Sequence, residues 1–192
     1  LFRSDTIIKA LDRKDVTIAL CAPTGRAAKR MAESTGQEAK TIHRLLEIDP
    51  VSGTFRRQRA YPLDADLVIA DEASMIDIEL MRALLDALSP RAALVLVGDA
   101  DQLPSVGPGQ VLADIIASEV IPVVRLTEVF RQAETSRIIA AAHAVNHGEV
   151  PEGAKSPDDG DFFVIEMASP EDGANKVVDI VTNRLPRRFG LD

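Results

Sequence analysis

The stretch DLVIADEASM, residues 66–75, constrains the fold of this chain more than any other part of its sequence. Its apolar residues 67–70 form a continuous run, which is typical of a strand buried on both faces of a parallel sheet. The run ends at two adjacent acids, Asp71 and Glu72. Two like charges at the edge of an apolar core are costly unless a cation lies beside them, so the pair points to a metal ion.

Apolar runs alternate with helical segments through the first half of the chain. Further strands are predicted over residues 16–21 and 93–97. Helices are predicted over residues 26–34, 41–47 and 80–88. Asp77 is the expected N-cap of the third helix. The alternation predicts an α/β fold with a mostly parallel sheet that is covered by helices on both faces.

Turn-forming or acidic residues follow three of the predicted strands, at residues 23–25, 71–72 and 98–99. Ligands bind open parallel sheets at the carboxyl ends of the strands. We therefore expect these three strand ends to form one rim.

The second half of the chain gives weaker signals. We expect strands over residues 123–126 and 162–166 and a helix over residues 136–146. Another helix is expected to start near Ser169 and to include residues 177–184. Residues 148–161 are rich in proline, glycine and acid, and they predict an exposed loop. His143 and His147 are four residues apart, a spacing that can bind zinc, but no third ligand accompanies them, so we expect structural or surface roles.

The charge balance limits the ligands that the chain can attract. Lysine and arginine total 22 against 30 for aspartate and glutamate, which gives a formal charge of -8. Nucleic-acid binding would therefore require a local basic face. The single cysteine cannot form an internal disulfide, and no apolar run reaches the ~20 residues that span a bilayer, so we expect a cytoplasmic protein with no membrane partner.

An Asp-Glu pair after a buried strand suits nucleotide hydrolysis. Asp71 would hold Mg²⁺ and Glu72 would orient and deprotonate the attacking water. Residues 96–109 form a glycine- and proline-rich loop that can place the Gln102 amide near a terminal phosphate. Two alternatives are that the acids cap the following helix, or that they form a metal-dependent nuclease site with Asp99.

Five segments together resemble the RecD-type branch of superfamily I DNA helicases, which includes the exodeoxyribonuclease V alpha subunit: CAPTGRAAKRM, KTIHRLLE, VIADEASM, LVGDADQLPSVGPG and LTEVFRQ. The resemblance implies a RecA-like P-loop NTPase fold and an ATP- and Mg²⁺-dependent motor that moves 5'-to-3' on single-stranded DNA in recombination and repair. It implies that the motor works alone or with other subunits of a recombination complex. Residues 1–147 would be the first motor domain, 148–161 an exposed acidic loop, and 162–192 the end of that domain before a second one.

The resemblance also implies roles for individual residues. Asp71 and Glu72 would be the Walker B pair, with Asp71 on the metal. Gln102 would couple the phosphate state to DNA, and Arg131 would stabilise charge on the transferring phosphoryl group. A guanidinium suits that role because it grips phosphate oxygens at two points, although a surface ion pair with a neighbouring glutamate is the alternative for Arg131.

The same resemblance implies a set of DNA-binding residues: Pro23, Thr24, Gly25, Arg26, Thr41 and His43. A helix N-terminus after residue 25 would offer backbone N–H groups to a phosphate. Lys29 and Arg30 share a helical face with Arg26, and a solvated basic face is the alternative there. Near Phe55 and Tyr61 we expect a packed hairpin rather than a platform for stacking bases.

The GxxxxGK[ST] phosphate loop of such motors is not in the sequence. Arg3, Ser4 and Asp5 stand where its Gly-Lys-Thr would lie. We expect that the loop lies upstream in a longer protein. The alternative is a degenerate nucleotide site in a non-catalytic module that binds nucleic acid or protein.

Overall fold

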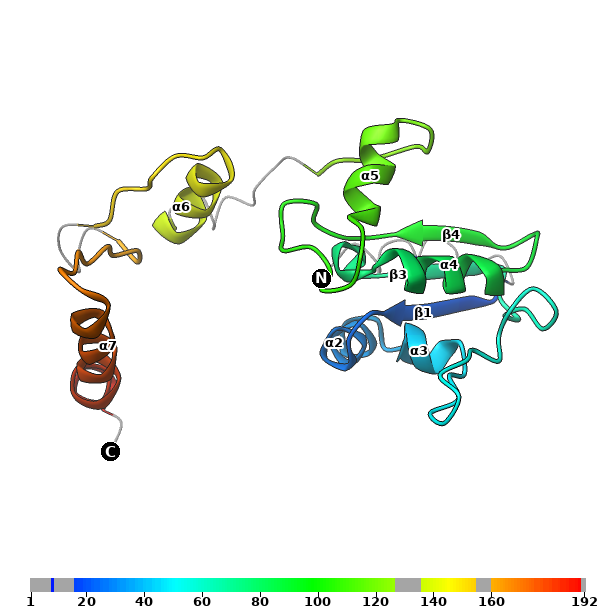
Figure 1. Ribbon diagram of the computed structural model, residues 1–192, viewed down its shortest axis with the longest axis horizontal. Helices are drawn as coiled ribbons and strands as arrows, with labels where there is room; N and C mark the ends of the chain where they lie inside the picture. The colour runs from blue at the N-terminus through cyan, green and yellow to red at the C-terminus, as the bar shows by residue number, and fades with distance from the viewer. Residues whose placement is uncertain (1–7, 9–15, 127–135, 155–159, 191–192) are drawn as a thin grey trace. The chain divides into compact units, whose positions relative to one another are not determined.

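The computed structural model describes residues 8, 16–126, 136–154 and 160–190. The chain divides into two compact units, Leu1–Arg125 and Leu126–Asp192 (Figure 1). The predicted boundaries at residues 147 and 161 stay a prediction.

The first unit is built on a four-stranded sheet. Its strands are β1 (Ile18–Ala22), β2 (Ala39–Thr41), β3 (Leu67–Ala70) and β4 (Ala93–Leu96). All neighbouring strands are parallel, in the order β2-β1-β3-β4. All four residues of β3 are buried, as the continuous apolar run predicts. The parallel sheet confirms the predicted α/β fold class.

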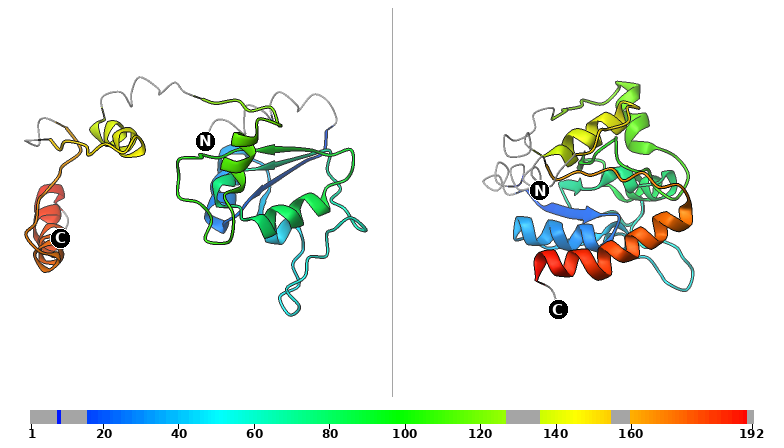
Figure 2. Two further views of the ribbon diagram at one scale, coloured as in Figure 1. Left: turned by 45° about the horizontal axis from the view of Figure 1, so that its top comes forward. Right: turned by 90° about the vertical axis from the view of Figure 1, so that its left-hand side faces the viewer.

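The helices of the first unit are α2 (Gly25–Thr35), α3 (Ile42–Leu45), α4 (Ile78–Ala87) and α5 (Val111–Ser118), with a 3₁₀ turn, η1, at Ala73–Met75. Two hydrophobic clusters divide the strands between them. Ile69 of β3 packs in one cluster with Met31 of α2, whereas Val68 packs in the other with Leu84 of α4. The sheet is therefore covered on both faces, as predicted (Figure 2).

Local caps fix the bounds of the helices. The Thr24 hydroxyl accepts a hydrogen bond from the Ala27 N–H at 3.2 Å, and Gly36 ends α2 in the left-handed region at φ 69°. The Asp77 carboxylate accepts one from the Leu80 N–H at 2.8 Å, which confirms the predicted N-cap of α4. Within α4, Leu84 is fully buried, whereas the next residue, Leu85, is 53% exposed.

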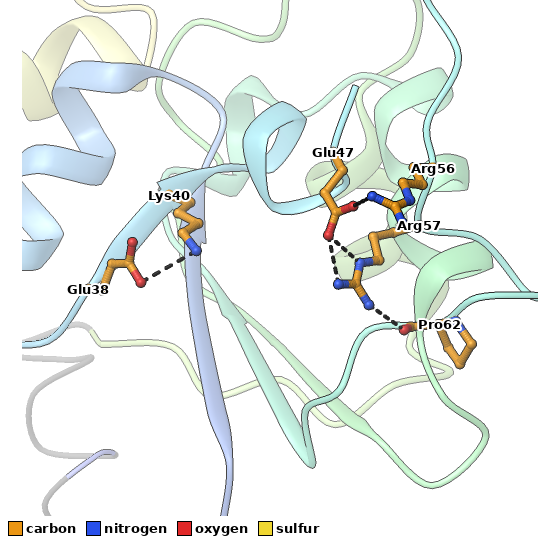
Figure 3. Close-up of polar contacts among 6 residues, drawn as sticks. All are labelled: Glu38, Lys40, Glu47, Arg56, Arg57 and Pro62. Atoms are coloured by element: carbon orange, nitrogen blue, oxygen red, sulfur yellow. Dashed lines mark hydrogen bonds and ion pairs between the residues drawn. The ribbon is translucent and has the colours of Figure 1, made fainter. Parts of the chain in front are cut away.

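Residues 47–62 form the packed hairpin expected from the sequence, with antiparallel bridges between Ile48 and Phe55 and between Gln58 and Tyr61. The Arg57 guanidinium links the first and last residues of this hairpin, Glu47 and Pro62. Two of its nitrogens bind Glu47 Oε1 at 2.7 and 2.6 Å, and Nη1 donates to the Pro62 carbonyl at 3.1 Å (Figure 3). Hydrogen bonds between charged groups are stronger than those between neutral groups, and the Arg57 side chain is only 21% exposed.

The second unit contains α6 (Arg137–Asn146), α7 (Pro170–Asp179), the π-helical turn η2 (Ile180–Arg184) and α8 (Leu185–Phe189). The start of α7 at Ser169 and the helix predicted over residues 136–146 are confirmed. The strands predicted over residues 123–126 and 162–166 do not form, so both predictions are wrong. Phe163, Val164 and Ile165 are 47–54% exposed, and no strand among the described residues pairs with them.

Candidate active site

A cavity of about 250 Å³ opens at the carboxyl ends of β3 and β4. Its lining residues come from α2 and from the two strand ends: Ala27, Arg30, Met31, Ser34, Asp71, Glu72, Val97, Gly98, Asp99 and Gln102. The acids and the glutamine, which the sequence places 30 residues apart, therefore share one rim. Two of the three strand ends expected to form one rim line this cavity, at residues 71–72 and 98–99, whereas residues 23–25 do not.

Asp71 directly follows β3, and hydrogen bonds position its backbone and one of its carboxylate oxygens. Its N–H donates to the Cys21 carbonyl of β1 at 2.9 Å. Its Oδ1 accepts from the Glu72 N–H at 2.9 Å, and Oδ2 has no hydrogen-bond partner in the described part of the chain. One carboxylate oxygen is thus available to a cation.

Glu72 lies in the left-handed region, at φ 54° and ψ 40°. A residue with a Cβ in this conformation costs of order 1–3 kcal/mol, and such strain gathers at functional sites. Neighbouring backbone bonds hold the turn, because the Ala73 N–H donates to Val97 at 2.9 Å and the Met75 N–H donates to Glu72 at 3.0 Å. The same turn means that the acids do not cap α4, since Asp77 caps it.

Gly98 lets the end of β4 approach this turn closely. A Cβ at Gly98 would lie 3.0 Å from the Ala73 nitrogen and 2.8 Å from Leu112 Cδ2. The close approach brings Asp99 and Gln102 to the cavity. The Gln102 Nε2 donates to Asp99 Oδ2 at 3.3 Å.

The chain matches the family model described as "AAA domain" over residues 5–165, which is most of its length. The chain belongs to the AAA domain family. The predicted RecD-type resemblance is confirmed by relatives. The ATP-dependent RecD2 DNA helicase of Deinococcus radiodurans is 47% identical over 134 residues, which cover 70% of this chain and 18% of that protein. The RecBCD enzyme subunit RecD of Mycolicibacterium smegmatis is 45% identical over 116 residues, which cover 52% of this chain and 21% of that protein.

A more distant relative is the ATP-dependent DNA helicase dda of Enterobacteria phage T4, 36% identical over 110 residues, which cover 54% of this chain and 25% of that protein. Among solved structures, Bacteroides Pif1 bound to ssDNA aligns with a TM-score of 0.49 and 18% identity, covering 92% of this chain and 49% of that one. This AAA domain thus spans about a fifth to a quarter of the length of the curated relatives it matches.

The residues expected to bind DNA lie at the ends of two neighbouring strands of the AAA domain. Ala22 at the end of β1 pairs with Thr41 at the end of β2, so residues 23–26 and Thr41 share one edge. Gly25 and Arg26 are exposed at the N-terminus of α2, and His43 is exposed on α3. The hydroxyls of Thr24 and Thr41 each cap the helix that follows.

The structure places two basic residues of α2 differently. Lys29 is exposed and pairs with Glu33 at 3.8 Å, as a solvated face predicts. Arg30, in contrast, lines the acidic cavity. Sequence reasoning placed both on one basic face and missed this role, although their adjacent positions differ by about 100° around a helix. Arg131 lies outside the described residues.

Other candidate chemical groups of the AAA domain have structural roles. Burial raises the pKa of the Cys21 thiol to about 12, so it is a core residue. The His147 ring bonds the His143 carbonyl at 2.8 Å, and within the described ranges no three metal-binding side chains gather. His43 lies 5.8 Å from Phe55, and Arg57 covers the Tyr61 ring at 4.2 Å, so the aromatic rings pack within the chain. Of the helices described, none has the length and apolar character to cross a membrane.

Proposed function

We propose that this AAA domain is the first motor domain of a RecD-type, ATP-dependent DNA helicase that couples ATP hydrolysis to 5'-to-3' movement on single-stranded DNA. The observation that carries the proposal is the shared rim of Asp71, Glu72 and Gln102 at the ends of β3 and β4. The names of the relatives, which are ATP-dependent DNA helicases and RecD subunits, agree with it.

The donor set at the rim fits Mg²⁺. This ion is commonly bound by one or two carboxylates together with phosphate oxygens and water, and Asp71 Oδ2 offers one such ligand. When bound, the metal would neutralise charge on the phosphate oxygens. A site of this kind needs no cluster of three protein ligands.

Asp71, Glu72 and Gln102 then have distinct roles in hydrolysis. Asp71 holds the metal, and Glu72 orients the attacking water and takes its proton on the carboxylate. The Gln102 amide donates toward the terminal phosphate. Arg131 is proposed to stabilise charge on the transferring phosphoryl group.

The proposed DNA contacts are to the backbone. The N-terminus of α2, where Gly25 and Arg26 are exposed, suits a phosphate, and Arg26 adds charge there. Pro23, Thr41 and His43 lie near the same edge. Backbone contacts give little sequence preference, which suits a motor that moves along DNA. We further propose a cytoplasmic protein that acts in recombination and repair, alone or with other subunits of a recombination complex.

The test is the Glu72→Gln variant of the complete gene product. Removing a general base typically costs ~10²–10⁴-fold in rate, so DNA-stimulated ATP hydrolysis should fall by that order while nucleotide binding is retained. Glu79→Gln is the matched control, because Glu79 lies in the first turn of α4 and outside the cavity. Unchanged turnover in Glu72→Gln would remove the assignment of the base.

The same preparation separates the alternatives. A wild-type protein that binds DNA and hydrolyses no ATP would be a non-catalytic module. DNA cleavage with Mg²⁺ and without nucleotide, lost in Asp99→Asn, would indicate a nuclease. The complete reading frame tests the expected upstream phosphate loop.

A further inference from the structure

Ser74 carries a buried hydroxyl that the roles above leave unused. It lies in η1, two residues after Glu72, and is 8% exposed. Among the described residues it is the one buried polar side chain, and its Oγ has no hydrogen-bond partner. Leaving such a hydroxyl unpaired costs its full desolvation, so a partner in the working protein is expected.

Ser74 lines a second, smaller cavity of about 100 Å³. Its lining residues are Ser74, Ala100, Gln102, Pro104, Gln110, Leu112 and Ala113. Gln102 also lines the larger cavity that contains the acids, and it is the residue that the two linings share. Gln102 therefore lies between the small cavity and the proposed phosphate site.

The two sides of the small cavity differ in their freedom to move. The Ser74 backbone nitrogen is packed 3.1 Å from the position of a Cβ on Gly98, and the preceding residue is hydrogen-bonded to Val97. Gln102 is exposed, and its amide makes one long hydrogen bond, to Asp99 at 3.3 Å. Gln102 is thus the partner that can adjust.

The hydrogen bond to Asp99 determines which atom of the Gln102 carboxamide is free to accept a hydrogen bond. A carboxamide has two N–H donors on nitrogen and an acceptor oxygen. Because Nε2 donates to Asp99, which lines only the larger cavity, Oε1 is left to accept from a donor elsewhere. A serine hydroxyl is such a donor.

We propose that Ser74 is a positioning residue that donates its hydroxyl hydrogen to Gln102 Oε1 and so keeps the Gln102 amide nitrogen turned toward the nucleotide phosphate. This inference rests on the proposed function. An amide turned the other way would present its oxygen to an anion, which repels it.

The test uses the complete gene product and four proteins: wild type, Ser74→Ala, Gln102→Ala and the double variant. Losing one orienting hydrogen bond should lower kcat of DNA-stimulated ATP hydrolysis in Ser74→Ala about tenfold, with KM for ATP unchanged. In the Gln102→Ala background the same change should have no further effect. Ser74→Thr, which keeps the hydroxyl, should retain most of kcat.

Two results would overturn the proposal. One is a wild-type kcat in Ser74→Ala, which is what a hydroxyl satisfied by water alone would give. The other is a Ser74→Ala effect that persists in Gln102→Ala but disappears in Gln110→Ala, because Gln110 lines the small cavity only.

Thermal melting of the same four proteins without nucleotide or DNA separates this inference from the proposed function. Non-additive shifts in Tm would support the Ser74–Gln102 hydrogen bond even if the wild type hydrolysed no ATP, in which case only the proposed function would fail. Additive shifts together with additive effects on kcat would refute the pairing.

Discussion

The Gly98→Ala substitution tests whether the close approach at the end of β4 builds the candidate site. The added methyl would lie 2.8 Å from Leu112 Cδ2, 3.0 Å from the Ala73 nitrogen and 3.1 Å from the Ser74 nitrogen. Ordinary contacts of a carbon atom lie near ~3.5–4.0 Å, so these neighbours must retreat by roughly half an ångström or more.

The leucine methyl can rotate away, but the two backbone nitrogens cannot move as easily. The Ala73 N–H is hydrogen-bonded to the Val97 carbonyl at 2.9 Å, and moving it weakens that bond and shifts the strained Glu72 turn. Overpacking of this kind costs about 1–3 kcal/mol of unfolding free energy. With a urea m-value of about 1–3 kcal/mol/M, the unfolding midpoint should fall by roughly 1 M.

Urea unfolding of the 192-residue chain measures the effect through tyrosine fluorescence. Tyr61 is the sole tyrosine and the chain has no tryptophan, so the signal reports on the first unit alone. Gly25→Ala is the control, because a Cβ at Gly25 meets nothing within 4 Å and alanine favours the helix by up to about 1 kcal/mol. Equal midpoints for Gly98→Ala and wild type would refute the packing argument.

Two further predictions concern titrating groups. Burial raises the pKa of the Cys21 thiol from 9.0 to about 12. The folded protein at pH 8 should therefore react with a thiol reagent only as fast as it unfolds. Rapid labelling without urea would contradict this prediction. Asp161 accepts hydrogen bonds from the Ser136 hydroxyl at 2.7 Å and from the Arg137 N–H at 2.8 Å, and the hydroxyl in particular holds its carboxyl pKa below the usual 3.8. Its contribution to α6 should therefore be present above pH 3.8 and lost as the pH falls through the lower folded value. Because the pKa of Asp179 in α7 is also lowered, a far-UV CD titration should show a larger acid-dependent loss of helix in wild type than in Asp161→Asn, and equal losses would contradict this.

The elements that sequence reasoning found are those specified by local signals. The run at residues 67–70 is apolar at every position, and β3 occupies those four residues because it is central in the sheet. Asp77 is recognisable as a cap because a side-chain acceptor precedes an apolar helical repeat. Such signals require no knowledge of what lies across the fold.

The elements that sequence reasoning missed or predicted wrongly depend on distant partners. Residues 162–166 have the composition of a strand, but a strand needs a neighbour to complete its hydrogen bonds, and the sequence does not say whether one is present. β2 is only three residues long and owes its existence to pairing with β1. The helix α5 went unpredicted because its apolar residues directly follow the glycine-rich loop.

Some features of the candidate site could also be predicted from the sequence, and others could not. The convergence of Asp71 and Gln102 was predictable, because the carboxyl ends of parallel strands meet at one edge. The roles of Arg30 and Ser74 were not, because they depend on which way a helix faces and on how completely a turn is buried. Burial of a single hydroxyl leaves no mark in the sequence.

The charges around the larger cavity indicate what must complete the site. Of its lining residues, Asp71, Glu72 and Asp99 are acidic, and Arg30 is the one basic side chain that the described part of the chain contributes. A triphosphate brought to this rim would meet an excess of negative charge, which is costly unless further cations balance it. Under the proposed function, Mg²⁺ on Asp71 and the guanidinium of Arg131 would supply part of that balance. ATP affinity of the complete protein should therefore depend strongly on Mg²⁺.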